Sequence, residues 1–236
     1  MGVNMSDLDT VSFLAEKDTI QSQRLTFERK VEHIGALLFA NNLNRPVLYR
    51  ILDTVKPGTL PIFDLEECIQ AMPEFKVATQ PPYFLIEWLV KAEALDFIEV
   101  DDAGQPVTDE LRAGKTEDEI DDMIADMLIE ITAVGREALK VFSPLQRLQY
   151  LLDEVPERLD TYAEVLGFVT EKRSFSEIDK LLQGRPILMS GKQPNENPMQ
   201  PSVFIDKLAA AGGIIYDDGW ILTSEGKEML ERILSK

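Results

Sequence analysis

The sequence predicts a mostly helical α+β fold in which two similar units follow one another behind an N-terminal helical arm. Three observations predict it: apolar residues recur at helical spacing along most of the chain, short stretches of alternating apolar and polar residues interrupt them, and this order of patterns occurs twice. The 236 residues suffice for two domains, and 44% hydrophobic with 28% charged residues is typical of a globular chain.

The elements of the first half follow from changes in this spacing. Residues 1–43 are expected to form an arm that ends in a helix over 27–40. Three further helices are predicted, the first capped by Asn44 and the last ending near residue 94, and the alternation of a strand follows over 95–100. The side chains expected to face the core are Val31, Ile34, Leu37, Leu38, Val47, Leu48, Ile51, Leu52, Val55, Leu65, Cys68 and Ile69.

The second half repeats the first at two constant spacings. The pairs 119 residues apart are Pro82 and Pro201, Ile86 and Ile205, Leu89 and Leu208, Ala92 and Ala211, Leu95 and Ile214, and Phe97 and Tyr216. The pairs 91 residues apart are Ile131 and Leu222, Thr132 and Thr223, Gly135 and Gly226, and Leu139 and Leu230. Because the two spacings differ by 28 residues, the first copy is expected to hold an insert of about that length between its two strands.

The repeat sets the expected domain boundaries. A first unit is predicted over 44–142, with its insert at about 101–128, then a helical connector over 143–157 and a second unit over 158–236. The insert is acidic, because residues 101–130 hold eleven acidic and two basic side chains, half of the net charge of −18. Its apolar residues recur at helical spacing, which predicts a short amphipathic helix containing Ile120, Ile124, Met127 and Leu128.

The junction of the last strand and helix carries a resemblance to a known family. Ile131-Thr132 with Gly135, and Leu222-Thr223 with Gly226, resemble the strand-to-helix motif of the winged-helix family, a helix-turn-helix class. The resemblance implies two diverged winged-helix units in tandem. In DNA-binding members of that family the third helix enters the major groove, and the helices that match it here begin at Pro82 and Pro201.

These two helices are poor in the side chains that read DNA. The first carries Glu87 and Glu93 beside Lys91 and has no Arg, Asn or Gln, and the second hairpin turns on Asp217-Asp218. The net charge of −18 also repels a polyanion. We therefore expect a protein-binding adaptor or regulatory assembly factor whose partner has a basic surface. The alternative is a DNA-binding transcriptional regulator.

Catalytic and metal-binding motifs are missing from the sequence. His33 and Cys68 are the single residues of their types, which excludes an intramolecular disulfide and a Cys/His zinc cluster. No nucleophile motif accompanies His33 and no glycine-rich phosphate loop is found. We expect neither an enzyme nor a bound cofactor.

Two sets of residues are candidates for binding a macromolecule. Leu85 and Trp88 are expected on a side of their helix away from the core positions, where they form a partner surface with Lys91 or pack against the N-terminal helix or the other copy. If nucleic acid binds, we expect cations in and near the loop 184–198, which is otherwise a connector, to contact it. These cations are Lys172, Arg173, Arg185, Lys192 and Lys207.

The sequence also gives an expectation for the compartment. No apolar stretch reaches the roughly 18 residues needed to span a bilayer, and Met1–Thr10 lacks the pattern of a secretion signal. We therefore expect a soluble cytoplasmic protein with no membrane contact. Formation of a homodimer is left open.

Overall fold

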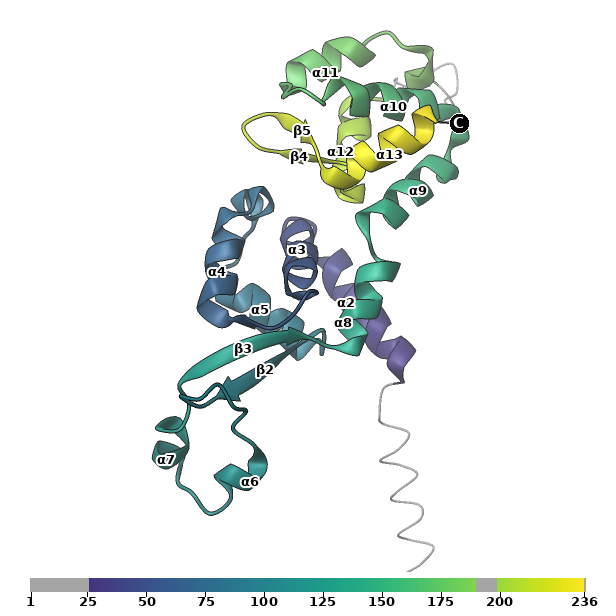
Figure 1. Ribbon diagram of the computed structural model, residues 1–236. Coiled ribbons are helices and arrows are strands. Elements are labelled where there is room, and N and C mark those ends of the chain that lie inside the picture. Colours follow the sequence, from purple (N-terminus) through teal and green to yellow (C-terminus); the bar gives the residue numbers. More distant parts are fainter. Residues whose placement is uncertain (1–25, 190–198, 236) are drawn as a thin grey trace, which may run out of the picture.

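The computed structural model describes residues 26–189 and 199–235 and contains two hydrophobic cores. The described chain is mostly helical with small antiparallel sheets, as predicted (Figure 1). The first core is formed by α2 (Phe27–Ala40), α3 (Arg45–Val55), β1 (Leu60–Pro61), α4 (Ile62–Ala71), the 3-10 helix η1 (Pro73–Val77), α5 (Pro82–Lys91), β2 (Leu95–Val100), β3 (Asp126–Ile131) and α8 (Ala133–Val141). The second is formed by α9 (Pro144–Glu154), α10 (Leu159–Phe168), α11 (Phe175–Leu182), α12 (Ser202–Ala211), β4 (Ile214–Tyr216), β5 (Trp220–Leu222) and α13 (Ser224–Leu234).

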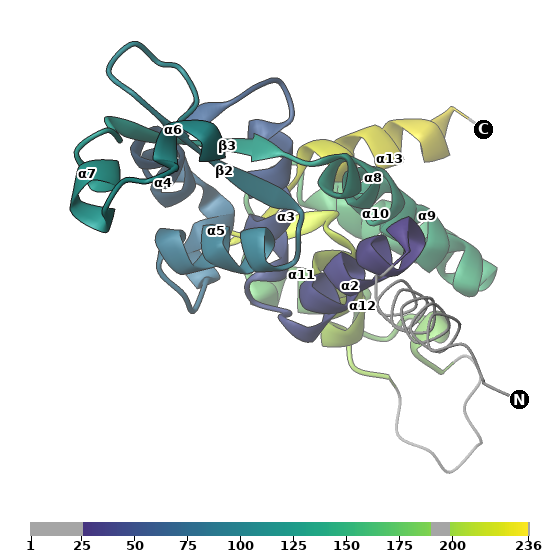
Figure 2. The same ribbon diagram turned by 90° about the horizontal axis from the view of Figure 1, so that it is seen from below.

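The helix predicted over 27–40 is part of the first core. Its residues Val31, Ile34 and Leu38 are buried, and α2 packs along α8 in both views (Figures 1 and 2). Asn44 lies at the N-cap position of α3 as expected, but its side chain makes no capping hydrogen bond there. It accepts instead from the backbone N–H of Thr79 at 2.8 Å, which ties the loop before α5 to the start of α3.

Helix α9 lies in the segment expected to connect the two units, yet it contributes to the second core. Leu148 and Leu152 are buried there, 114 residues after Ile34 and Leu38 of α2. The same spacing relates the core residues of α3 to those of α10. Helix α9 is therefore the counterpart of α2 in element order, so each core begins with a helix of this kind.

The strand registers repeat between the two sheets. Strands β2 and β3 pair Leu95 with Ile131 and Phe97 with Ile129. Strands β4 and β5 pair the residues 119 and 91 positions later, Ile214 with Leu222 and Tyr216 with Trp220. The spacings read from the sequence thus describe the same strand pairing in both halves.

The strand-to-helix junctions also repeat, down to single hydrogen bonds. The hydroxyl of Thr132 accepts from the N–H of Gly135 at 3.0 Å and donates to the carbonyl of Glu93 at 2.7 Å. Thr223 makes the same two bonds, with the N–H of Gly226 at 3.0 Å and the carbonyl of Gly212 at 2.7 Å. A Thr followed three residues later by Gly can therefore cap the last helix and hold it against the preceding loop.

The acidic insert lies between β2 and β3, as predicted, and carries two short helices, α6 (Asp109–Arg112) and α7 (Glu117–Asp121). The longer helix expected through Met127 and Leu128 is wrong, because these residues belong to β3 and pair with Glu99 and Ile98. Figure 1 shows α6 and α7 at the end of the molecule away from the second core. The inward placement of Cys68 is also wrong, since its side chain is exposed.

None of the helices in residues 26–189 and 199–235 has both the length and the apolar composition that crossing a bilayer requires.

The two junction glycines give a test of the repeated packing. A Cβ on Gly135 or Gly226 would lie less than 3.0 Å from a backbone carbonyl oxygen, of Ala94 or Gly213 respectively. We expect Gly135→Ala and Gly226→Ala each to lower the free energy of unfolding by at least about 2 kcal/mol, because a backbone atom must move. Urea unfolding measures this quantity. The control is Gly167→Ala in α10, where no atom of the described residues beyond the adjacent backbone lies within 4 Å of the new Cβ, and a small gain of up to about 1 kcal/mol is expected. Equal effects at all three positions would contradict this packing.

Candidate functional site

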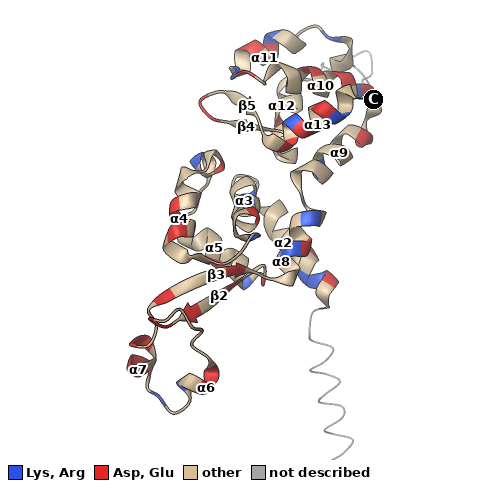
Figure 3. Cartoon of the chain, in the orientation of Figure 1, with Lys and Arg blue, Asp and Glu red and all other residues tan. Residues whose placement is uncertain are grey.

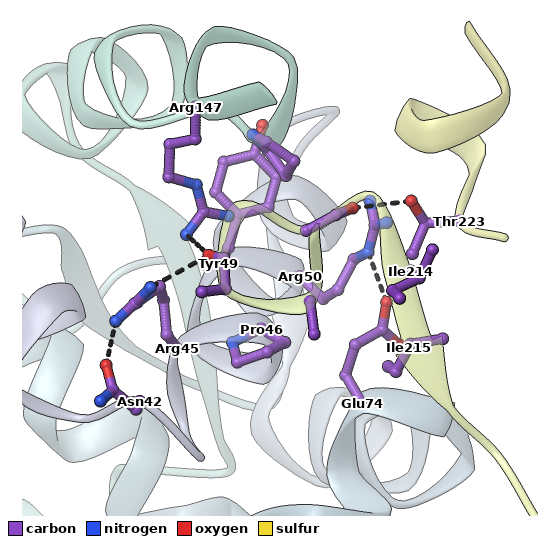
Figure 4. Close-up of a pocket in the computed structure, with 14 residues that line it drawn as sticks. Asn42, Arg45, Pro46, Tyr49, Arg50, Glu74, Arg147, Ile214, Ile215 and Thr223 are labelled. Carbon is purple, nitrogen blue, oxygen red and sulfur yellow. Dashed lines mark hydrogen bonds and ion pairs between the residues drawn. The ribbon is translucent and has the colours of Figure 1, made fainter. Parts of the chain in front are cut away.

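The two cores meet along a seam, which we define as the contact of α3 and η1 with α12, β4 and α13. At its centre the Arg50 guanidinium donates to both carboxylate oxygens of Glu225, each at 2.7 Å. Its Nε donates to Glu74 at 2.8 Å (Figure 4). The three side chains are 21%, 14% and 10% exposed for Arg50, Glu225 and Glu74. One guanidinium of the first unit therefore holds one carboxylate from each unit in a mostly buried ion-pair network.

The charges of this network stabilise one another. Burial by itself raises the pKa of Glu225, but the hydrogen bonds and charge of Arg50 outweigh it, and the pKa lies below its ordinary value of 4.5. Glu225 also lies in the first turn of α13, where the helix dipole favours a negative charge. The carboxylate is therefore ionised in the folded protein at neutral pH.

A second contact across the seam joins two more arginines. Arg45 of α3 and Arg147 of α9 both donate to the carbonyl of Ala210, at 3.0 and 3.5 Å (Figure 4). Ala210 lies in the last turn of α12, where the helix dipole places partial negative charge. Arg45 also donates to the carbonyl of Leu38 at 3.1 Å and to the side chain of Asn42. The seam thus gathers three guanidinium groups within one contact region.

Arg45 and Arg147 line two adjoining spaces. The inner one is a cavity of about 40 Å³, which Tyr49, Arg50 and Thr223 also line. The outer one is a groove of about 560 Å³ between α2 and α8 of the first unit and α9 and α12 of the second. Burial, with the neighbouring charge of Arg45, lowers the pKa of Arg147 to about 10. The Nε of Arg147 is buried and has no hydrogen-bond partner among the described residues.

At the seam, the hairpin of β4 and β5 and the helix α12 face the first unit. Asp217, in the turn between β4 and β5, forms ion pairs with Lys76 of η1 and, at 3.3 Å, with Lys172. The hydrogen bonds of Lys76 and Lys172 lower the pKa of Asp217. Strand β4 also contacts η1, and the carbonyl of Ala210 on α12 accepts from Arg45. The helix and hairpin that would contact DNA in a winged-helix reader are therefore partly covered by the first unit.

The residues expected to form a partner surface on α5 differ in their exposure. Leu85 is fully buried, so of its two alternatives the partner surface is wrong. Helix α5 packs against α3, α4 and β2, and this wide contact buries Leu85 in addition to Ile86 and Leu89. Trp88 is half-buried and, with Lys91, lines a groove of about 390 Å³ against α2. Trp88 thus packs on the first core and also faces a groove.

Phe84 is the residue of this face that sequence reasoning missed. It is 47% exposed and precedes Trp88 and Lys91 by four and seven positions, which places the three on one stripe of α5. Its neighbour Tyr83 is equally exposed, and the two rings pack edge to face with centroids 5.9 Å apart. The signal was present in the sequence as two aromatic residues in the first turn after Pro82.

Four of the five cations expected to contact nucleic acid lie in the described chain, and each of the four has a carboxylate partner there. Lys172 pairs with Asp217 and Arg173 with Glu171, at 3.3 and 2.6 Å. Arg185 pairs with Glu164 of α10, and Lys207 with Glu154 of α9 at 3.2 Å. Lys192 lies outside the described residues. Asp and Glu positions are spread over the elements of both units and over α6 and α7 (Figure 3).

No group of three or more His, Cys, Asp or Glu side chains in the described ranges could hold a metal ion. Comparisons with protein-family models, with curated proteins and with solved structures found no match for this chain.

Acid titration tests the central ion pair. Because the folded-state pKa of Glu225 lies below 4.5, its contribution to stability is complete above that pH and is lost as the pH falls below it. We expect Glu225→Gln to cost roughly 2 kcal/mol above pH 4.5 and progressively less in more acid solution. Urea unfolding over a pH series measures the difference. Glu228→Gln is the control, since its pair with Arg232 on the same helix is about half exposed. A cost for Glu225→Gln that is independent of pH would contradict the ion-pair account.

Proposed function

We propose that the chain is a non-enzymatic tandem winged-helix protein that acts as a protein-binding adaptor or regulatory assembly factor. The observation that carries the proposal is the exposed face of α5, the counterpart of the DNA-reading helix. It presents the aromatic side chains of Tyr83 and Phe84, while its cation Lys91 is paired with Glu87 at 2.7 Å. Exposed aromatic groups beside a groove are typical of a protein interface.

The repeated architecture supports the winged-helix assignment. Each core has its helices in the same order, a hairpin after the fourth helix, and a final helix that begins at the Thr and Gly junction. A third short strand, β1, pairs with β3 at Leu60 and Ile129. The second half has a single bridge in the corresponding place, between Arg173 and Trp220. Three helices with such a hairpin are the pattern that the winged-helix family would show.

A basic partner surface follows from the distribution of charge. The hairpin insert extends from the first unit and carries Asp109, Glu110, Glu117 and Asp118, with Arg112 paired to Glu99. A partner that places an apolar side chain in the groove of Trp88 and cations near the insert would satisfy both features.

The alternative of a DNA-binding regulator is disfavoured by the same contacts. In the second unit the helix and hairpin face the first unit, and in the first unit the helix that would read bases carries no unpaired cation within the described residues. Phosphate contacts by Lys and Arg normally supply most non-specific affinity.

A gel-shift titration with mixed-sequence duplex DNA tests this ranking. We expect no retardation at micromolar protein in physiological salt, because the candidate cations among the described residues are paired with carboxylates and would have to leave them to replace the counterions of the duplex. Tight binding that weakens steadily over a salt series would instead favour the DNA-binding regulator.

The partner surface is tested by capture with the immobilised chain. We expect Phe84→Ala to lower recovery of the protein partner at least tenfold, because an exposed aromatic anchor at an interface contributes on the order of 1.4 kcal/mol or more. Quantitative mass spectrometry of captured proteins is the measurement. Phe63→Ala is the matched control, since Phe63 is 74% exposed on α4. Equal loss with both variants, or none with Phe84→Ala, would remove the α5 face as the interface.

A further inference from the structure

Two of the three arginines at the seam lack a carboxylate partner in the described chain. Arg50 has both Glu74 and Glu225, whereas no carboxylate in residues 26–189 and 199–235 lies within 4.0 Å of Arg45 or Arg147. The two guanidiniums share one neutral acceptor, the carbonyl of Ala210. Like charges side by side in a buried position are costly unless an anion is near them.

We propose that the seam binds a small amphipathic carboxylate, with its carboxylate group at Arg45 and Arg147 and its apolar body in the outer groove. This inference is independent of the proposed adaptor function. The planar guanidinium group offers parallel N–H donors that match the two oxygens of a carboxylate. Each guanidinium carries five N–H groups, of which Arg45 uses three and Arg147 one in hydrogen bonds to the described residues, so further N–H groups on their terminal nitrogens remain to donate to it.

The inner cavity has room for a small polar group. Its volume is about 40 Å³, and it adjoins the outer groove through Arg45 and Arg147, which line both spaces. A carboxylate is a compact group of three heavy atoms with the two oxygens that a guanidinium binds, so it suits this position at the end of an apolar chain.

The outer groove supplies an apolar site for the rest of the ligand. It is lined by Phe39 of α2, Val141 of α8 and the C-cap residue Phe142, and Tyr150 and Leu151 of α9. Three of them, Phe39, Val141 and Tyr150, are large side chains left exposed. The charges at its rim, Lys207 and Glu154, neutralise each other at 3.2 Å. The groove therefore attracts an uncharged, apolar chain or ring, and the one local excess of positive charge lies at its floor.

The ligand would contact both units at once. Phe39 of α2 and Arg45 of α3 lie in the first unit, and Arg147 and Leu151 of α9 pack with the second. A molecule bound there adds contacts that exist only while the two units are docked. Binding therefore raises the melting temperature of the whole chain.

The test is a titration of the full chain with octanoate, phenylbutyrate and octanol, followed by calorimetry and by the melting temperature. We expect at least one of the two carboxylates to bind and to raise the melting temperature. Octanol, which has the body of octanoate without its charge, is expected to bind at least tenfold more weakly than octanoate, since charge-assisted hydrogen bonds are lost. Arg147→Gln should lower carboxylate affinity at least tenfold.

Arg158→Gln is the matched control. Its Nε is also buried without a partner, but Arg158 lines neither the cavity nor the groove, so its variant should bind as the wild type does. Equal affinity for octanoate and octanol would overturn the proposal even if Arg147→Gln failed to fold. Failure of both carboxylates to bind at millimolar concentration would also overturn it, as would much tighter binding of a peptide through its terminal carboxylate.

Discussion

The position of Arg50 at the seam is the constraint on which the arrangement of the two units depends. Its guanidinium holds Glu74 of its own unit and Glu225 of the other, in a place where each charge is mostly buried. Removing one member would leave an uncompensated charge, so the network favours a single docked orientation more than it adds net stability. The orientation matters because the inner cavity and the outer groove are lined by both units and exist only in the docked form.

Docking decides which faces of the units remain available. It turns β4, β5 and the end of α12 toward the first unit, where Lys76 and Arg45 contact them. The face of α5 stays open, with Phe84 exposed and Trp88 beside a groove. The proposed protein-binding role rests on this arrangement, because α12 is partly covered and α5 presents aromatic side chains on an acidic chain. The same docking creates the cavity where Arg45 and Arg147 meet.

The candidate site shows which of its residues could be predicted from their spacing in the sequence. The stripe of α5 was found through Trp88 and Lys91, but Leu85 was assigned to it and Phe84 was not. The helical spacing of apolar residues predicts a single buried face, of the width expected for a helix packed against one neighbour. Helix α5 packs against α3, α4 and β2, so its buried face is wider than that. The width of a buried face depends on how many elements surround the helix. Helix α9 was assigned as a connector, although its Leu148 and Leu152 are buried in the second core. The residue spacing of a helix between two units does not show which of the two cores it packs against.

The sequence by itself determined the local structure: the helix over 27–40, the strand over 95–100, and the spacings of 119 and 91 residues that the strand registers reproduce. These features depend on side-chain periodicity and on local bonds such as those of Thr132 and Thr223, which residues close in the chain supply. Only the tertiary structure decided that Arg50 meets Glu225, 175 residues away, and that Arg45 and Arg147 converge on Ala210. Contacts between the two units depend on the shape and charge of surfaces that form only after each unit has folded. The spacing of residues along the chain does not specify how these surfaces fit together.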